Sequence, residues 1–309
     1  MKYLITGGAG FIGSHLVELL LENNHEVICI DDLSSGYISN LTTVLHKINF
    51  YEEKIEIFDF NRLENIDAVI HLAAQPSVPL SISNFSLSSS SNLLGTIKVI
   101  DYCRSNNIPL AFASSSAVYG NLEFGNDEIN NVDLLSPYAT DKYAMELYTK
   151  TAYKIYQLSS IGLRFFNVYG PRQDPNSAYS GVISIFADRL LDGKNITING
   201  GHQTRDFVYV KDVVKVIYSA INVATSRSIC EISNVLTGKS ITINELAQQM
   251  IVITKAEVEL QYKSLPLGDP KQSNGSSKKM AKLFKVNPNN FTKLNYGLLS
   301  TVQYILKGE

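Results

Sequence analysis

Short apolar runs alternate with helical spacing through the first half of the chain. The helical stretches repeat apolar residues every three or four positions, as in Ile12, Leu16 and Leu20. Strands that are separated by helices pair in parallel and build a doubly wound sheet. We expect strands at residues 3–6, 27–30, 55–58, 68–72, 110–113 and 161–165.

The pattern changes after about residue 170, where glycine, proline and asparagine interrupt the apolar spacing. Only short elements remain, such as a strand at residues 229–232 and a helix at residues 243–251. We therefore expect an α/β fold in two parts. Residues 1–170 form a doubly wound domain that takes later strands from about residues 203–235, and residues 171–309 form a smaller mixed α/β lobe.

The composition is that of an ordinary soluble protein: 309 residues, 45% apolar and 18% charged, with a net charge of −2. This charge offers no electrostatic reason to bind nucleic acid or an anionic membrane. Cys29, Cys103 and Cys230 are far apart in apolar runs, which predicts buried thiols and no metal site. Since neither an export signal nor a membrane-spanning run is visible, we expect a cytoplasmic protein.

A glycine-rich turn follows the first expected strand and precedes a helix. Gly7 permits the tight turn, Gly10 lets backbone N–H groups approach a phosphate, and Gly13 lets the helix pack close to the sheet. This is the pyrophosphate-binding start of a Rossmann fold, aided by the helix N-terminus. Asp31, 18 residues after Gly13, suits a carboxylate that binds the adenosine ribose, unless it only caps its strand. A carboxylate there repels a 2′-phosphate, which favours NAD over NADP.

A tyrosine and a lysine stand four residues apart after Pro137, which is typical of a helix start. In a helix, Tyr138 and Lys142 share one face, and a neighbouring ammonium lowers the pKa of a phenol. A surface pair would have the same spacing. Residues 114–116 are serines directly after an expected strand, where a hydroxyl can relay a substrate proton or simply close a turn.

Together these motifs resemble the extended short-chain dehydrogenase/reductase superfamily of nucleotide-sugar epimerases and dehydratases, from Lys2 to about Asn287. The motifs are Thr6-Gly7-Gly8-Ala9-Gly10-Phe11-Ile12-Gly13, Asp31-Asp32-Leu33-Ser34-Ser35-Gly36, His71-Leu72-Ala73-Ala74-Gln75, Ser114-Ser115-Ser116-Ala117-Val118-Tyr119-Gly120, Tyr138-x-x-x-Lys142, Arg164-Phe165-Phe166-Asn167-Val168-Tyr169-Gly170 and Arg205-Asp206-Phe207-Val208-Tyr209-Val210. Besides Gly7, Gly10, Gly13 and Asp31, the resemblance implies that NAD is bound by Phe11, Ile12, Asp32, Leu33, Ser34, Ser35, Gly36, Asp59, Phe60, Leu72, Ala73, Ala74, Gln75, Asn92, Ser114, Tyr138, Lys142 and Phe166.

Within the superfamily, the chain most resembles the UDP-hexose 4-epimerases. Ser115 takes the catalytic hydroxyl position, and Ser116-Ala117 stand where dehydratases carry Asp-Glu, which disfavours dehydration. The resemblance implies that Tyr138, bridged by Ser115, removes the 4-hydroxyl proton while hydride passes from C4 to NAD. The 4-keto sugar then turns and receives the hydride on its other face. Lys142 would tune Tyr138 and hold the nicotinamide ribose.

The resemblance also implies a UDP-sugar site formed by Ser115, Ser116, Asn167, Val182, Thr197, Asn199, Arg205 and Ser273. Arg205 would bind a phosphate bidentately, unless it only pairs with Asp206. Relatives usually carry another arginine where this chain has Pro266, and Lys271 is a candidate substitute. Residues 173–179 resemble epimerases that accept N-acetylated sugars. Ser273 replaces the bulky tyrosine of hexose-restricted relatives, which leaves space for an acetamido group.

Two other functions stay open. Residues 265–272 resemble part of the UDP-glucuronate decarboxylases, which also oxidise C4. The fold could also belong to an inactive NAD-binding regulatory paralogue, although the intact Ser115, Tyr138 and Lys142 argue against this. Relatives pair through two helices each, which implies a homodimer through the helices near residues 87–103 and 138–156.

Overall fold

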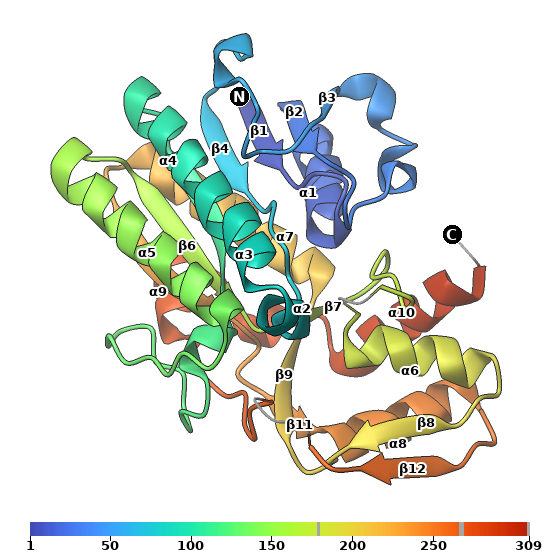
Figure 1. Cartoon of the computed structure of the whole chain (residues 1–309). Helices are drawn as coiled ribbons and strands as arrows, with labels where there is room; N and C mark the ends of the chain where they lie inside the picture. The colour runs from blue at the N-terminus through green and yellow to red at the C-terminus, as the bar shows by residue number, and fades with distance from the viewer. Residues whose placement is uncertain (178–179, 266–268, 308–309) are drawn as a thin grey trace.

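A parallel seven-stranded sheet forms the centre of the described part of the chain (Figure 1). The computed structural model describes residues 1–177, 180–265 and 269–307. The strand order is β10-β6-β5-β4-β1-β2-β3, and every neighbouring pair is parallel. The predicted doubly wound sheet is thus confirmed. Its strands are β1 (Lys2–Thr6), β2 (Glu26–Asp31), β3 (Asn49–Glu52), β4 (Ala68–His71), β5 (Leu110–Ser115), β6 (Ser160–Phe165) and β10 (Cys230–Val235).

Helices cover both faces of this sheet, which is why its strands read as continuous apolar runs. In β1, Tyr3 and Ile5 pack with one layer of helices while Leu4 packs with the other, because successive side chains point to opposite faces. The first layer contains α1 (Phe11–Glu22), α7 (Val210–Ser226) and α9 (Lys278–Phe284). The second contains α2 (Val78–Ser83), α3 (Phe85–Ser89), α4 (Gly95–Asn106) and α5 (Pro137–Tyr156).

The smaller lobe lies beyond the carboxyl ends of the central strands (Figure 1). The predicted strand near residues 229–232 is β10 and joins the large sheet, whereas β9 belongs to a small sheet with β7 and β11. The predicted helix at residues 243–251 is α8, which begins with a capping box between Thr242 and Glu245. The lobe's strands are β7 (Asn167–Tyr169), β8 (Ile196–Asn199), β9 (Thr204–Tyr209), β11 (Ser240–Thr242) and β12 (Leu260–Lys263), and its helices are α6 (Val182–Leu191), α8 (Ile243–Thr254) and α10 (Leu294–Lys307).

The strand predicted at residues 55–58 is wrong. These residues form a turn, and the edge strand is β3, which pairs with β2. Ile55 and Phe58 are buried, but Ile57 is 74% exposed, so the apolar residues do not form a strand buried on both faces. The true edge strand contains the polar residues Asn49 and Glu52, both exposed, and a search for apolar runs therefore misses it.

Cys29 and Cys103 are buried free thiols, as predicted, whereas Cys230 is only partly buried. In the part of the chain that the structure describes, we find no helix with the length and apolarity needed to cross a membrane.

Candidate active site

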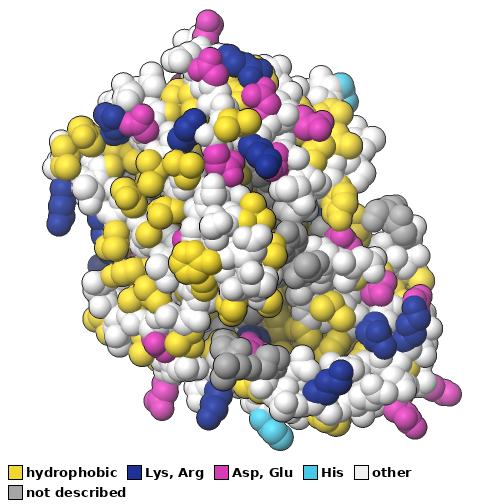
Figure 2. All heavy atoms as spheres, viewed as in Figure 1, with side chains coloured by type: hydrophobic (Ala, Val, Ile, Leu, Met, Phe, Trp, Pro, Cys, Tyr) yellow, Lys and Arg dark blue, Asp and Glu magenta, His cyan; other side chains and the backbone are white. Residues whose placement is uncertain are grey.

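A cavity of about 680 Å³ opens at the carboxyl ends of the central strands. Figure 2 shows the surface hollowed between the two parts of the molecule. The chain connections diverge to opposite faces of the sheet beside β1, and such a switch point leaves a ligand-binding crevice. The predicted site residues on the cavity wall are Gly7, Gly10, Phe11, Ile12, Gly13, Asp31, Asp32, Ser34, Ser35, Leu72, Ala73, Ala74, Gln75, Ser114, Ser115, Tyr138, Lys142, Phe166 and Asn167.

The glycine-rich turn leaves no room for side chains. Gly7 has a φ of +75°, and a Cβ there would lie 2.7 Å from the Ala73 nitrogen. A Cβ on Gly13 would lie 2.0 Å from the Gly7 carbonyl oxygen. Helix α1 begins at Phe11, and no side chain caps its first N–H groups. The turn therefore presents bare backbone and unpaired helix donors to the cavity, as an anion site requires.

Asp31 ends β2 and supports the same turn. Its carboxylate oxygens accept hydrogen bonds from the backbone nitrogens of Ala9, at 2.8 Å, and Leu33, at 2.9 Å. Leu33 has a φ of +56°, so the chain turns sharply there and brings Ser34 and Ser35 to the wall. Burial raises the pKa of Asp31, while the backbone hydrogen bonds oppose this change.

Strand β5 and helix α5 bring the three predicted catalytic residues to one part of the cavity. Strand β5 ends at Ser115, whose Oγ accepts a hydrogen bond from the Ala117 nitrogen. Ser136 caps α5, so Tyr138 and Lys142 lie in its first two turns. The Lys142 ammonium donates to the Ala113 carbonyl at 2.8 Å and lies 5.8 Å from the centre of the Tyr138 ring. Helical spacing predicted that both side chains share one face of the helix, and the family resemblance implied their role.

Burial shifts the pKa values of both side chains of this pair. Burial raises the pKa of Tyr138, and its hydrogen bond with Ser115 opposes this only in part. Burial also lowers the pKa of Lys142 to about 8, against the opposing charge of Asp141. Burial thus acts against the lowering of the Tyr138 pKa that was expected from Lys142 and a bound nicotinamide, and that lowering stays a prediction.

The predicted UDP-sugar residues are spread over the smaller lobe. Asn167 lines the cavity, and its amide donates to the Ser273 hydroxyl at 3.2 Å. Arg205 pairs with Asp269 at 2.5 Å rather than with Asp206, whose carboxylate accepts from Thr237 and Lys239. The predicted residues that do not line the cavity are Ser116, Val182, Thr197, Asn199, Arg205 and Ser273. Pro266, Ala178 and Tyr179 lie outside the described residues.

Known proteins with similar sequences and folds agree with this geometry. Residues 3–235 match the model of the NAD dependent epimerase/dehydratase family. This chain belongs to that family. A putative UDP-glucose 4-epimerase from Methanocaldococcus jannaschii is 41% identical over 247 residues, which cover 79% of each chain.

Two solved structures of the family have nearly the same fold. One is a UDP-N-acetylglucosamine 4-epimerase from Methanobrevibacter ruminantium in complex with UDP-N-acetylmuramic acid, with a TM-score of 0.93, 34% identity and coverage of 100% and 99% of the two chains. The other is a UDP-glucuronic acid 4-epimerase from Bacillus cereus with UDP-glucuronic acid and NAD, with a TM-score of 0.92, 29% identity and full coverage of both chains. The family therefore contains enzymes for different sugars.

The cofactor of the family, NAD, suits the residues of this chain. A Cβ at Gly7 or Gly13 would clash with the backbone of the turn, so both positions need glycine. Glycines at these positions let a pyrophosphate group approach the backbone closely. The carboxylate of Asp31 ends the second strand, where an adenosine ribose is bound in such folds. The cavity then continues to Lys142 on α5 and to Phe166, which directly follows β6.

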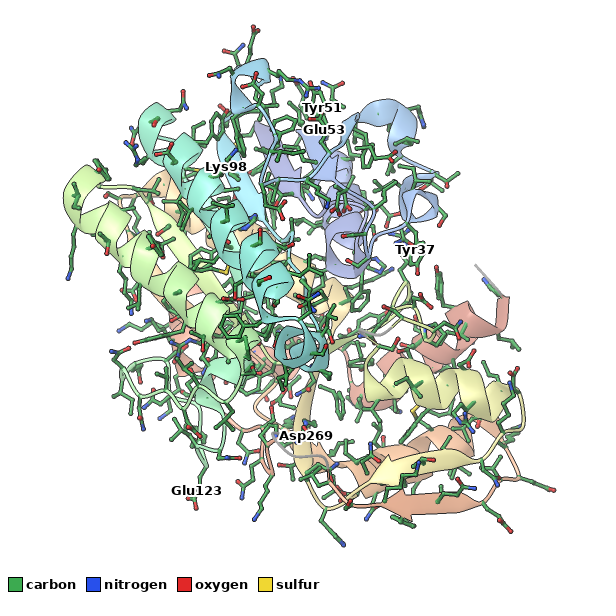
Figure 3. All side chains as sticks on the ribbon, viewed as in Figure 1. Tyr37, Tyr51, Glu53, Lys98, Glu123 and Asp269 are labelled. Carbon is green, nitrogen blue, oxygen red and sulfur yellow. The ribbon has the colours of Figure 1, made fainter. Side chains whose placement is uncertain are left out.

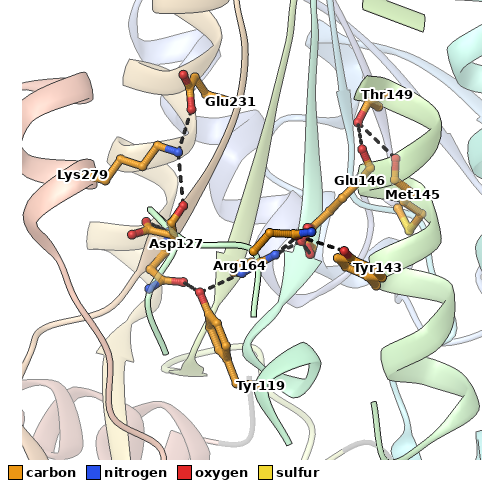
Figure 4. A network of polar contacts seen from close by, with 12 residues as sticks. Tyr119, Asp127, Tyr143, Met145, Glu146, Thr149, Arg164, Glu231 and Lys279 are labelled. Atoms are coloured by element: carbon orange, nitrogen blue, oxygen red, sulfur yellow. Dashed lines mark hydrogen bonds and ion pairs between the residues drawn. The ribbon is translucent and has the colours of Figure 1, made fainter. Parts of the chain in front are cut away.

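Beneath this site lies a buried polar network that sequence reasoning missed (Figure 4). Glu146 on α5 is fully buried and accepts two hydrogen bonds from Arg164 on β6, at 2.8 and 2.6 Å. The same carboxylate accepts from the Ser114 hydroxyl at 2.6 Å, and Arg164 donates to Tyr119. The sequence contains one feature that could have predicted this network, because Glu146 follows Lys142 by four residues and so lies on the same helix face.

Several predicted cofactor residues lie elsewhere. Asp59 caps a short turn by accepting from Asn61, and Phe60 stacks on Tyr102, so neither reaches the cavity. The family resemblance had implied both residues, and among the described residues after β3 the cavity wall contains Glu53, Lys54, Ile55 and Glu56.

The other predicted residues that are absent from the wall support it from behind. Asn92 is fully buried and exchanges hydrogen bonds with both backbone groups of Gln75. Gly36 packs against the backbone of Ala9, where a Cβ would lie 2.9 Å from the carbonyl carbon. Leu33 contributes its backbone nitrogen to Asp31.

Proposed function

We propose that the protein catalyses reversible 4-epimerisation of a neutral UDP-hexose or UDP-N-acetylhexosamine. The observation that carries this proposal is the meeting of Ser115, Tyr138 and Lys142 in the cavity that the glycine-rich turn also lines. When bound, NAD supplies reversible hydride transfer.

In this proposal, side chains of the protein itself remove and return the proton of the sugar hydroxyl. Tyr138 takes the proton of the sugar 4-hydroxyl through its hydrogen-bonded partner Ser115 and returns it when C4 is reduced again. Because burial raises the pKa of Tyr138, we expect the phenol to ionise only when a ligand brings a positive charge beside it in addition to Lys142. Lys142, tied to the Ala113 carbonyl, would hold the nicotinamide ribose.

A neutral sugar agrees with the charges around the cavity. Among its described lining residues, the lysines and arginines are Lys54, Lys142 and Arg172. Lys54 follows β3, at the far edge of the sheet from Ser115, and Arg172 is paired with Glu18. Among these described lining residues, the cation nearest to a C6 carboxylate beside Ser115 would therefore be Lys142, which a reaction at C4 already requires. This favours hexoses over UDP-glucuronate.

The test is incubation of the purified protein with UDP-glucose, UDP-N-acetylglucosamine and UDP-glucuronate, with the products resolved by anion exchange. We expect conversion of at least one neutral sugar to its C4 epimer. Replacing Tyr138 by Phe should reduce this conversion by about a hundredfold or more, while bound NAD stays unchanged.

Three outcomes would contradict the proposal. Release of carbon dioxide from UDP-glucuronate would assign the decarboxylase reaction instead. Protein that carries NAD and leaves every UDP-sugar unchanged would be the regulatory paralogue. A Tyr138→Phe variant with most of its activity would remove Tyr138 from its role as the base.

A further inference from the structure

The segment that follows β7 is tied to the nucleotide-binding domain at three points. We call residues 171–174 the strap. The Pro171 carbonyl bonds His15 Nε2 at 3.0 Å, and Arg172 pairs with Glu18 at 2.5 Å. Both partners lie on α1, one and two turns after its start beside the glycine-rich turn. The strap therefore lies along the helix whose N-terminal donors face the cavity.

The third tie crosses the cavity. Tyr37 donates its hydroxyl proton to an Asp174 carboxylate oxygen at 2.6 Å, and both residues line the cavity wall. Figure 3 shows Tyr37 on the side of the nucleotide-binding domain that faces the smaller lobe. The backbone nitrogen of Tyr37 also donates to the Ala9 carbonyl within the glycine-rich turn. The bond from Tyr37 to Asp174 thus joins the turn to the strap.

Arg172 has an unused hydrogen-bond donor at this place. Its NH2 nitrogen is held by Glu18, but its NH1 nitrogen is buried and has no partner. Its φ is +70°, a left-handed conformation that only a minority of residues other than glycine adopt. An unpaired buried donor and a strained backbone both cost free energy, and such costs concentrate where a ligand is bound.

We propose that Arg172 donates through NH1 to a phosphate of NAD, and that Tyr37 and Asp174 hold the strap closed over the bound cofactor. A guanidinium suits phosphate because its N–H groups lie in one plane and stay charged. Glu18 orients the group from its other side. This inference depends on NAD binding, which the family shows, and not on which sugar the enzyme converts.

The experiment measures binding to the NAD-free protein by calorimetry with two probes, ADP and adenosine. Replacing Arg172 by Gln should weaken ADP binding by about tenfold or more and leave adenosine binding within about twofold. Arg172→Lys should recover part of the loss because it keeps the charge. The matched control is Arg104→Gln, since Arg104 also pairs with a carboxylate at 2.5 Å and does not line the cavity.

The strap itself is tested on the NAD-loaded protein by the rate of NAD release, read with an added alcohol dehydrogenase at 340 nm. Tyr37→Phe and Asp174→Asn should each speed release by about threefold or more, and the double variant should be no faster than the faster single variant. A third variant, Arg172→Gly, relieves the left-handed backbone, so it should fold and still release NAD faster.

Equal ADP affinity in Arg172→Gln and wild type would overturn the phosphate contact. An equal loss of ADP and adenosine binding would also overturn it, since the defect would then not concern phosphate. Release rates that do not change in Tyr37→Phe and Asp174→Asn would overturn the closing role of the strap.

Discussion

Burial controls the charge of the reactive side chains in the cavity. Lys142 is only 2% exposed, and burial lowers its pKa to about 8 from the ordinary 10.5. The same loss of water raises the pKa of Tyr138. Burial therefore disfavours both charged forms, so the ionisation of this pair responds to any charge that a ligand brings into the cavity.

Stability should depend on pH through Lys142. Between pH 8 and 10.5 the unfolded chain binds more protons at this lysine than the folded protein, so stability rises with pH in this window. Replacing Lys142 by Met should remove this rise. The unfolding free energy of wild type minus that of the variant should therefore increase by about 3 kcal/mol from pH 8 to pH 10.5. Urea unfolding of the NAD-free proteins at several pH values measures it. The control variant is Lys263→Met, at an exposed position on β12, which should show the same pH dependence as wild type. If the unfolding free energies of wild type and Lys142→Met change with pH in the same way, the assignment to Lys142 is contradicted.

Ser273 should decide which sugars are accepted. Its hydroxyl accepts a hydrogen bond from Asn167, which lines the cavity, so a larger side chain at this position would reach toward the sugar. We expect Ser273→Tyr to abolish turnover of UDP-N-acetylglucosamine, by about a hundredfold or more, while UDP-glucose is still converted. Ser273→Ala should keep both activities. An equal loss on both sugars would show that Ser273 is no size filter.

At the level of secondary structure, the ion pair between Glu146 and Arg164 fixes α5 to β6 of the sheet. Glu146 and Arg164 are 0% and 3% exposed, and Ser114 at the end of β5 shares the same carboxylate. This junction holds the strand that carries Ser115 and the helix that carries Tyr138 in one arrangement (Figure 4). A charged pair at this depth is stable only while both partners are present.

Removing one partner should therefore cost more than removing both. Arg164→Met leaves the Glu146 carboxylate buried without its cation, and we expect a loss of about 3–5 kcal/mol in unfolding free energy. The double variant Glu146→Met with Arg164→Met should be less destabilised than Arg164→Met alone. Urea unfolding at pH 7 measures both, and simply additive losses would contradict a coupled pair.

At the scale of the whole molecule, apolar side chains gather on the outer surface of the second helix layer. Figure 2 shows this cluster on the side of α4 and α5. Monomeric proteins rarely expose large contiguous apolar patches, so we infer that the patch pairs with a second copy of the chain. Its residues are 46–62% exposed and comprise Leu87, Leu94, Leu147, Tyr148, Ile155 and Tyr156.

A charge in this patch should separate the proposed homodimer. The double variant Leu147→Glu with Ile155→Glu places carboxylates on the exposed face of α5 and should elute as a monomer in size-exclusion chromatography with light scattering. Val252→Glu, on the 75% exposed position of α8 in the other lobe, should leave the mass of wild type unchanged. A dimeric mass for the double variant, or a monomeric wild type, would contradict this interface.

Local patterns predicted those parts of the site that depend on neighbouring residues. The glycine-rich turn needs only three glycines, and the pairing of Tyr138 with Lys142 needs only the repeat of a helix. Asp59 and Phe60 were implied by the family resemblance, and neither lines the cavity. Local patterns gave no sign of the wall that follows β3, because this edge strand has few apolar residues. Local patterns also could not predict the ion-pair partner of Arg205, since Asp269 is 64 residues away in the sequence.

The amino-acid sequence by itself determined the parallel sheet, the glycine-rich turn and the helix that carries Tyr138 and Lys142, since apolar spacing and glycine geometry act over a few neighbouring residues. Only the tertiary structure decided the burial that shifts the pKa values of Tyr138 and Lys142, the partner of Arg205 and the hydrogen bond from Tyr37 to the strap. These features depend on how much water is excluded and on which distant groups meet. No local spacing encodes either quantity, because both arise when segments far apart in the chain pack together.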